Sequence, residues 1–136
     1  ASHIVDIPGS SAILAGGIVA YQNEVKESLL GVPHQVLENQ GAVSAETVKA
    51  MAEGARQKFG CEWAIATSGI AGPTGAEPGK PVGTVWMAVA NSLQNEAFCK
   101  IFEGNRTEVR EKSVYSVLGK LLFLLNNQKS TCTSEH

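Results

Sequence analysis

Cysteine is scarce in this sequence, and long apolar runs are absent. The three cysteines, Cys61, Cys99 and Cys132, are an odd number at wide spacing. This usage is typical of reduced thiols in a cytoplasmic protein and not of a disulfide framework or a zinc site. The longest apolar runs, residues 85–90 and 121–125, are far too short to cross a bilayer. We therefore expect a cytoplasmic protein with no signal peptide and no membrane contact.

Basic residues do not concentrate on any segment. The chain has 11 lysines and arginines against 13 acidic residues, a net charge of -2 and a pI of about 5.9. No basic stripe is present, so the sequence does not indicate nucleic-acid binding. The three histidines, His3, His34 and His136, are dispersed and lack ligand-like spacing to cysteine or carboxylate, so we expect no metal.

The composition is that of one globular domain. The chain has 136 residues, of which 43% are hydrophobic and 18% charged. A chain of this size buries roughly two thirds of its unfolded surface, so it needs no disulfide or metal to fold. We expect one domain over residues 1–126, followed by a polar, disordered tail over residues 127–136.

Two helices have clear start signals. Ser44 is a good N-cap, the apolar residues after it recur on one face of a 3.6-residue period, and Gly60 ends the pattern. A second helix is predicted over residues 106–125, where Asn105 and Glu108 have capping-box spacing. Shorter helical segments are predicted at residues 1–5, at 23–30 and around 36–37.

Four segments have strand character. Residues 63–68 form a near-continuous apolar run, which is typical of a strand buried on both faces. The turn at Asn91 predicts a hairpin between the last two strands. The predicted strands are 17–21, 63–68, 81–90 and 97–102. Together these patterns predict an α/β fold, a three-layer α/β/α sandwich with a mixed sheet.

One loop is unusually rich in glycine and proline. Residues 68–84 contain five glycines and three prolines among seventeen residues. Proline stiffens the chain and glycine lets the backbone approach a ligand, so the free N–H groups can hold an anion or a developing oxyanion. The spacing matches neither the phosphate-binding P-loop nor the dinucleotide fingerprint. A plain surface connection between two strands is the alternative.

Several motifs in this order resemble the C-terminal domain of the CinA family (competence/damage-inducible protein A). The most specific pair is S-G-I-A-G-P at residues 68–73 followed by K-P-V-G-T-V at residues 80–85. A weaker match, F-E-G-N-R, has Asn105 where the family usually has aspartate. The remaining matches are residues 6–11, 17–26 and 41–44, and the resemblance extends to about residue 125.

The resemblance implies an amidase that hydrolyses nicotinamide mononucleotide to nicotinic acid mononucleotide and ammonia, without metal or cofactor. The nucleophilic serine of the family stands in an E-S-C-T-G-G motif, which residues 1–136 do not contain. The chain is therefore expected to lack the family's N-terminal strand and most of a helix. A non-catalytic nucleotide-binding domain and a purely architectural module are the alternatives.

Carried over from the family, Tyr21 and Lys26 are implied as the proton-transfer pair. A lysine serves as a base when burial or a nearby positive charge lowers its pKa, and a phenol beside it can relay the proton. Without the resemblance, a packing tyrosine and a solvated lysine would be the simpler interpretation.

The substrate is expected to contact the loop and the start of the last helix. Arg106 and Arg110 lie one turn apart, where orphan N–H groups also suit a 5′-phosphate. Arg106 paired with a nearby glutamate on the surface is the alternative. Ser10 and Ser11 are expected to cap a short helix or to line the pocket. The loop residues expected at the substrate are Gly69, Ile70, Ala71 and Gly72. We also expect a homo-oligomer, because an unpaired strand edge would favour association.

Overall fold

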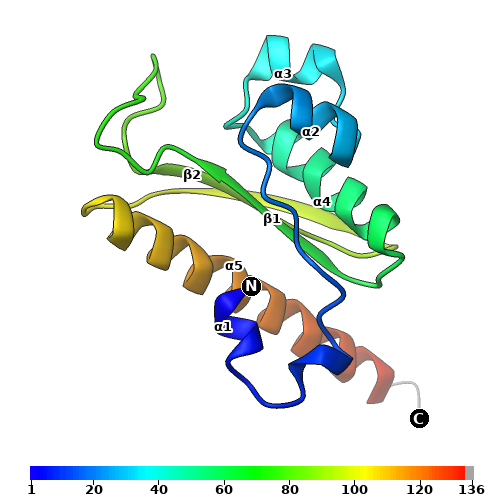
Figure 1. The fold of residues 1–136 in the computed structure, drawn as a ribbon. Coiled ribbons are helices and arrows are strands. Elements are labelled where there is room, and N and C mark those ends of the chain that lie inside the picture. The colour runs from blue at the N-terminus through cyan, green and yellow to red at the C-terminus, as the bar shows by residue number, and fades with distance from the viewer. Residues whose placement is uncertain (134–136) are drawn as a thin grey trace.

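The structure, a computed structural model, describes residues 1–133 and the side chains of residues 1–128. Three strands form a sheet between helices (Figure 1). No helix among these residues has both the length and the hydropathy that a membrane span requires. The elements in chain order are α1 (Ser2–Val5), η1 (Ser10–Ala12), α2 (Asn23–Leu30), α3 (His34–Gln40), α4 (Ala45–Phe59), β1 (Ala64–Gly69), β2 (Thr84–Ala90), β3 (Asn95–Ile101) and α5 (Arg106–Thr133).

The sheet is antiparallel throughout. Its strand order is β1-β2-β3, and β2 pairs with β1 and with β3, placing Met87 opposite Thr67 and Phe98. The predicted hairpin between β2 and β3 is confirmed, but the predicted mixed sheet is wrong. The strand expected to be buried on both faces is instead the edge strand β1, which is only half-buried because a single neighbour covers it in the described residues.

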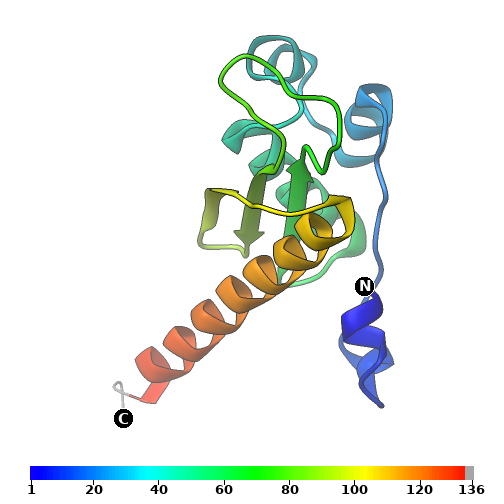
Figure 2. The ribbon, with the colours of Figure 1, turned by 90° about the vertical axis from the view of Figure 1, so that its left-hand side faces the viewer.

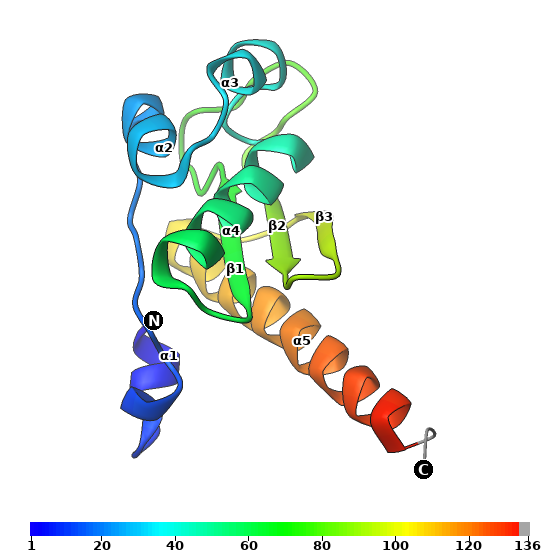
Figure 3. The same ribbon diagram turned by 90° about the vertical axis from the view of Figure 1, so that its right-hand side faces the viewer.

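The two faces of the sheet are covered by different helices. Side chains of β2 alternate: Val85 and Met87 pack with α5, whereas Ala88 and Ala90 pack with α4. This alternation is what the two-residue period of a strand requires. Figure 3 shows α4 and α5 crossing opposite faces of the strands. The chain thus forms three layers, helix on sheet on helix.

Helix α4 forms as its sequence predicts. Ser44 accepts a hydrogen bond from the Thr47 amide at 3.2 Å, and the helix ends at Gly60. The other side of α4 carries α2 and α3, with Leu30 and Met51 in their shared apolar cluster. At this crossing a Cβ added to Gly54 would lie 1.8 Å from the carbonyl oxygen of Leu30. The absence of a side chain therefore permits the two helices to touch backbone to backbone.

The strand predicted over residues 17–21 does not form. Its residues alternate as a strand would, with Ile18 and Ala20 packed inward and Val19 and Tyr21 exposed. However, no backbone hydrogen bond joins this segment to a strand in the described part of the chain. It runs as a connection from η1 to α2 beside the sheet (Figure 1).

The C-terminal helix is longer than predicted. Residues 127–133 continue α5, where a disordered tail was expected. No glycine or proline follows residue 126 to end the helix, and this explains the difference. Figure 2 shows these last turns running beyond the strands. Residues 134–136 of the predicted tail lie outside the described residues.

Candidate functional site

Lys26 is the one buried charged residue among the described side chains. Its side chain points from α2 into the protein and is only 5% exposed. Nζ donates to the carbonyl oxygens of Ala20 at 3.1 Å and Tyr21 at 3.3 Å. No carboxylate forms an ion pair with it among the described residues. Burial without a counter-charge lowers the pKa of Lys26 from its usual 10.5.

Tyr21 approaches Lys26 through its backbone. The carbonyl oxygen of Tyr21 accepts the hydrogen bond from Nζ, while its side chain is 80% exposed. The structure therefore brings the two residues together as a carbonyl–ammonium contact, with the phenol directed to the surface. A role for the phenol in proton transfer stays a prediction.

The glycine-rich loop between β1 and β2 has a closed base. Ile70 donates to the Thr84 carbonyl at 2.9 Å, and Gly83 donates to the Ile70 carbonyl at 2.7 Å. Gly83 has φ of 95°, and an added Cβ would lie 2.1 Å from the Phe102 carbonyl oxygen. Only glycine fits there. The strand that was predicted from residue 81 accordingly begins at Thr84, after the loop.

Arg106 fixes the middle of the loop. It lies at the first turn of α5, and its guanidinium donates to the Gly72 carbonyl at 3.0 Å. The helix start is fixed by the predicted capping box: Asn105 Oδ1 accepts from the Glu108 amide at 2.9 Å, and Glu108 accepts from the Asn105 amide at 3.2 Å. Glu108 is thus engaged with the cap and not with Arg106.

A cavity of about 410 Å³ lies between β1, the start of the loop and α5. Gly69, Ala71 and Arg110 line it, so the structure brings together three of the residues that were predicted to bind substrate. His3 and Thr67 also line it and were not predicted. Their sequence positions did not indicate a site. His3 and Thr67 come together only because α1 and β1 both pack against α5.

Other predicted site residues lie elsewhere. Ser10 and Ser11 lie within η1, on the N-terminal segment at the end of the molecule away from the loop (Figure 1). Their predicted capping role is wrong, because Gly9 occupies the N-cap and no side chain caps the turn. Neither serine lines the cavity. Ile70 is buried beside the loop base and contributes backbone hydrogen bonds.

A second, more apolar cavity of about 450 Å³ lies beside the edge of β1 that no other described strand pairs with. Ile65 and Ala66 of β1, Ile18 of the 17–21 segment, Phe59 of α4 and Leu118 of α5 line it. No lysine or arginine lines it, whereas Arg110 lines the polar cavity and can pair with an anionic nucleotide. The polar cavity beside the loop is therefore the better candidate for the phosphate end of a substrate.

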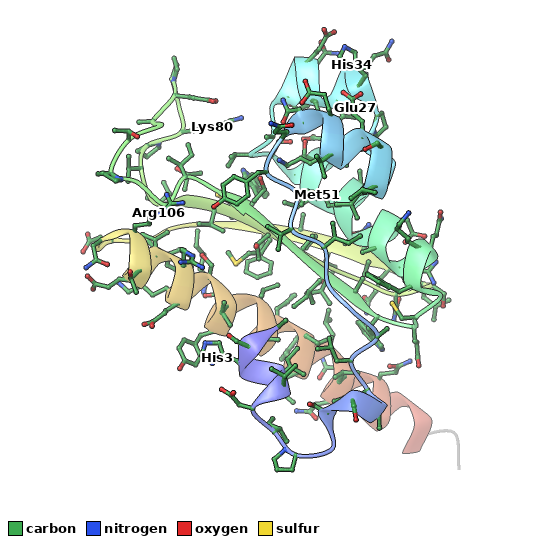
Figure 4. All side chains as sticks on the ribbon, viewed as in Figure 1. His3, Glu27, His34, Met51, Lys80 and Arg106 are labelled. Atoms are coloured by element: carbon green, nitrogen blue, oxygen red, sulfur yellow. The ribbon has the colours of Figure 1, made fainter. Side chains whose placement is uncertain are left out.

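A surface cluster joins α2 and α3. His34 contacts Glu27 at 2.7 Å and Glu38 at 3.0 Å. The hydrogen bond and charge of Glu27, followed by those of Glu38, raise the pKa of His34. Figure 4 shows His34 and Glu27 at the outer end of this helical pair. Among the described residues, no group of three or more histidine, cysteine, aspartate or glutamate side chains is arranged to hold a metal ion.

A family model that matches nearly the whole chain shows which family it belongs to. The model of the CinA C-terminal domain matches residues 1–125. The chain belongs to the CinA C-terminal domain family. A CinA-like protein from Anaeromyxobacter sp. (strain K) is 46% identical over 119 residues, and one from Parasynechococcus marenigrum is 50% identical over 117. These matches cover 88% and 85% of this CinA domain but 29% and 28% of the relatives' length.

Solved structures share the fold. A CinA superfamily protein from Enterobacter cloacae superposes with a TM-score of 0.88 at 32% identity, covering 91% of this chain and 73% of that one. A competence/damage-inducible protein from Agrobacterium tumefaciens gives 0.86 at 36% identity, covering 90% and 76%. The resemblance read from the motifs is confirmed at the level of the family.

Proposed function

We propose that this CinA domain hydrolyses the carboxamide of nicotinamide mononucleotide, giving nicotinic acid mononucleotide and ammonia. The reaction exchanges the amide nitrogen for an oxygen of water. The observation that supports it most is Lys26, a buried lysine with a lowered pKa that pairs with no carboxylate of the described residues. Such a residue is rare as a purely structural element, since buried charges are normally paired.

Lys26 would act as the general base. Its neutral amine, favoured by burial, accepts the proton of an attacking hydroxyl, and the resulting ammonium can return that proton to the departing ammonia. The carbonyls of Ala20 and Tyr21 hold Nζ in a fixed position. The nucleophile is assigned to no residue of this sequence, because residues 1–136 contain no E-S-C-T-G-G motif.

The loop and the start of α5 would bind the nucleotide. Arg110 lines the polar cavity, and Arg106 uses one N–H on Gly72 while a guanidinium has five donors in total. Both suit a phosphate at the N-terminal end of a helix. Backbone N–H groups of the loop could stabilise the oxyanion that forms at the carboxamide carbon.

Nucleotide binding without hydrolysis is the second candidate. One pair of observations favours it. Arg106 contacts the loop and Arg110 lines the adjacent cavity, whereas residues 1–136 do not contain the family's nucleophilic motif. Under this alternative the domain would bind the mononucleotide and release no ammonia.

Ammonia release tests the proposal. The purified chain is incubated with nicotinamide mononucleotide, and ammonia and nicotinic acid mononucleotide are quantified together with binding by calorimetry. We expect the two products in equal amounts. Binding without product would favour the second candidate, and absence of both would contradict both functions.

We also propose that the chain self-associates. Strand β1 has a free edge among the described residues, with the apolar cavity beside it. Light scattering over increasing concentration is expected to show a rising mass, and Ile18→Asp should reduce the rise while Val19→Asp, on the exposed side, should not. A constant monomer mass would contradict this.

A further inference from the structure

Lys80 connects the glycine-rich loop to a distant helix. Its Nζ donates to the carbonyl oxygen of Gln40, the last residue of α3, at 2.9 Å. The two residues are forty positions apart in sequence. Figure 4 shows the side chain directed from the loop toward the α3 side of the molecule.

The acceptor is a group that favours a cation. The last carbonyls of a helix have no partner within the helix, and they carry the negative end of its dipole. Lysine near such an end satisfies the carbonyl and the dipole together. Gly41 leaves space for the approach, since an added Cβ would lie 3.1 Å from Nζ.

The backbone at Lys80 is itself held. Glu77 donates to the Lys80 carbonyl at 2.9 Å, and Lys80 donates to the Glu77 carbonyl at 2.8 Å. A tether at Lys80 therefore restrains the whole tip of the loop. On the other side of the loop, Arg106 holds Gly72 at 3.0 Å, so two cationic side chains fix the loop at two points.

The end of α3 is anchored in turn. Ser44 and Thr47 donate to the Gly41 carbonyl at 3.1 Å and 2.7 Å. This fixes the end of α3 on the start of α4, and α4 packs against the sheet and against α2, which carries Lys26. Lys80 thus ties the loop to the helices that hold Lys26, whereas Arg106 ties it to α5 on the opposite face.

We propose that Lys80 is a positioning residue that sets the placement of the glycine-rich loop relative to Lys26 and does not touch the substrate. The proposal rests on the proposed function for its catalytic meaning. The alternative is that Lys80 contacts a substrate phosphate directly. The hydrogen bond from Nζ to the Gln40 carbonyl argues against this alternative.

Hydrogen exchange measured by mass spectrometry on the ligand-free chain tests the tether. The variants are Lys80→Met, Lys80→Arg, and the matched control Lys100→Met, an exposed lysine on β3. Loss of a hydrogen bond to a charged group should speed exchange of the hydrogen-bonded amides of Glu77 and Lys80 about tenfold in Lys80→Met. Lys80→Arg should largely restore protection, and Lys100→Met should match the unsubstituted chain. Unchanged exchange in Lys80→Met would overturn the proposal.

Calorimetric titration with nicotinamide mononucleotide separates the two roles. A positioning residue predicts that Lys80→Met weakens binding several-fold together with faster loop exchange, and that Lys80→Arg restores both. Weakened binding with unchanged exchange would show direct contact with the ligand and overturn the proposal, as would faster exchange with unchanged binding. If the unsubstituted chain binds no mononucleotide, the proposed function fails, and the exchange data alone still decide whether Lys80 holds the loop.

Discussion

Lys26→Met is expected to lower the rate of amide hydrolysis by about 10²- to 10⁴-fold, the usual contribution of a general base. Methionine keeps the length and apolar stem of lysine but cannot accept a proton. In the unsubstituted chain the rate should rise with pH through the pKa of Lys26, which burial holds below 10.5. The rate against pH is measured for both proteins, and the variant should show no such rise.

The folding of the variant provides an independent check of the Lys26 pKa. The pKa of Lys26 is lower in the folded state than in the unfolded chain. At a pH between these two pKa values, the unfolded chain binds a proton at Lys26 that the native chain does not bind. The free energy of unfolding therefore rises with pH over that window. Lys26→Met should lose this rise. Lys49→Met, an exposed lysine on α4, should retain both the rise and the activity. Equal activity in Lys26→Met and the unsubstituted chain would exclude Lys26 as the base.

Gly54→Ala is expected to lower the free energy of unfolding by about 3 kcal/mol or more, at the upper end for an overpacked contact. The new Cβ would lie 1.8 Å from the Leu30 carbonyl oxygen, which is backbone and cannot rotate away. Helix α2 must then move off α4, and the shared apolar cluster of Leu30 and Met51 opens. Urea denaturation followed by circular dichroism measures the change.

Gly119→Ala is the matched control for this prediction. Gly119 lies within α5, and an added Cβ there meets no atom within 4 Å. The same substitution should therefore stabilise the protein by about 0.5–1 kcal/mol, because alanine favours the helix over glycine. If both variants were equally stable, the close approach of α2 and α4 would not be a constraint.

The features predicted correctly are local in sequence. The cap of α4 depends on Ser44 and Thr47, three residues apart, and the capping box of α5 on Asn105 and Glu108. The β2–β3 hairpin closes through a short turn in which Asn91 accepts from Leu93 at 2.9 Å. In each case the residues that decide the structure are neighbours, so their types and spacing were sufficient.

The errors and omissions concern distant partners. Residues 17–21 have the alternation of a strand, but alternation cannot show whether a second strand lies beside them. The sequence singled out the loop and Arg106, but it did not indicate that Arg106 would bond to Gly72 or that Lys80 would reach Gln40. These contacts depend on how the layers pack, and residue spacing along the chain does not encode that.

The strand order β1-β2-β3 also affects the speed of folding. Each strand pairs with its neighbour in sequence, so the sheet requires no crossover connection. The β2–β3 turn spans only residues 91–94, and joining β1 to β2 closes the longer loop 70–83 at a cost that grows only logarithmically with length. Because the pairings join neighbours in sequence, the sheet has a low contact order, which favours fast assembly. The loop that carries the candidate site is therefore formed by the sheet pairing itself.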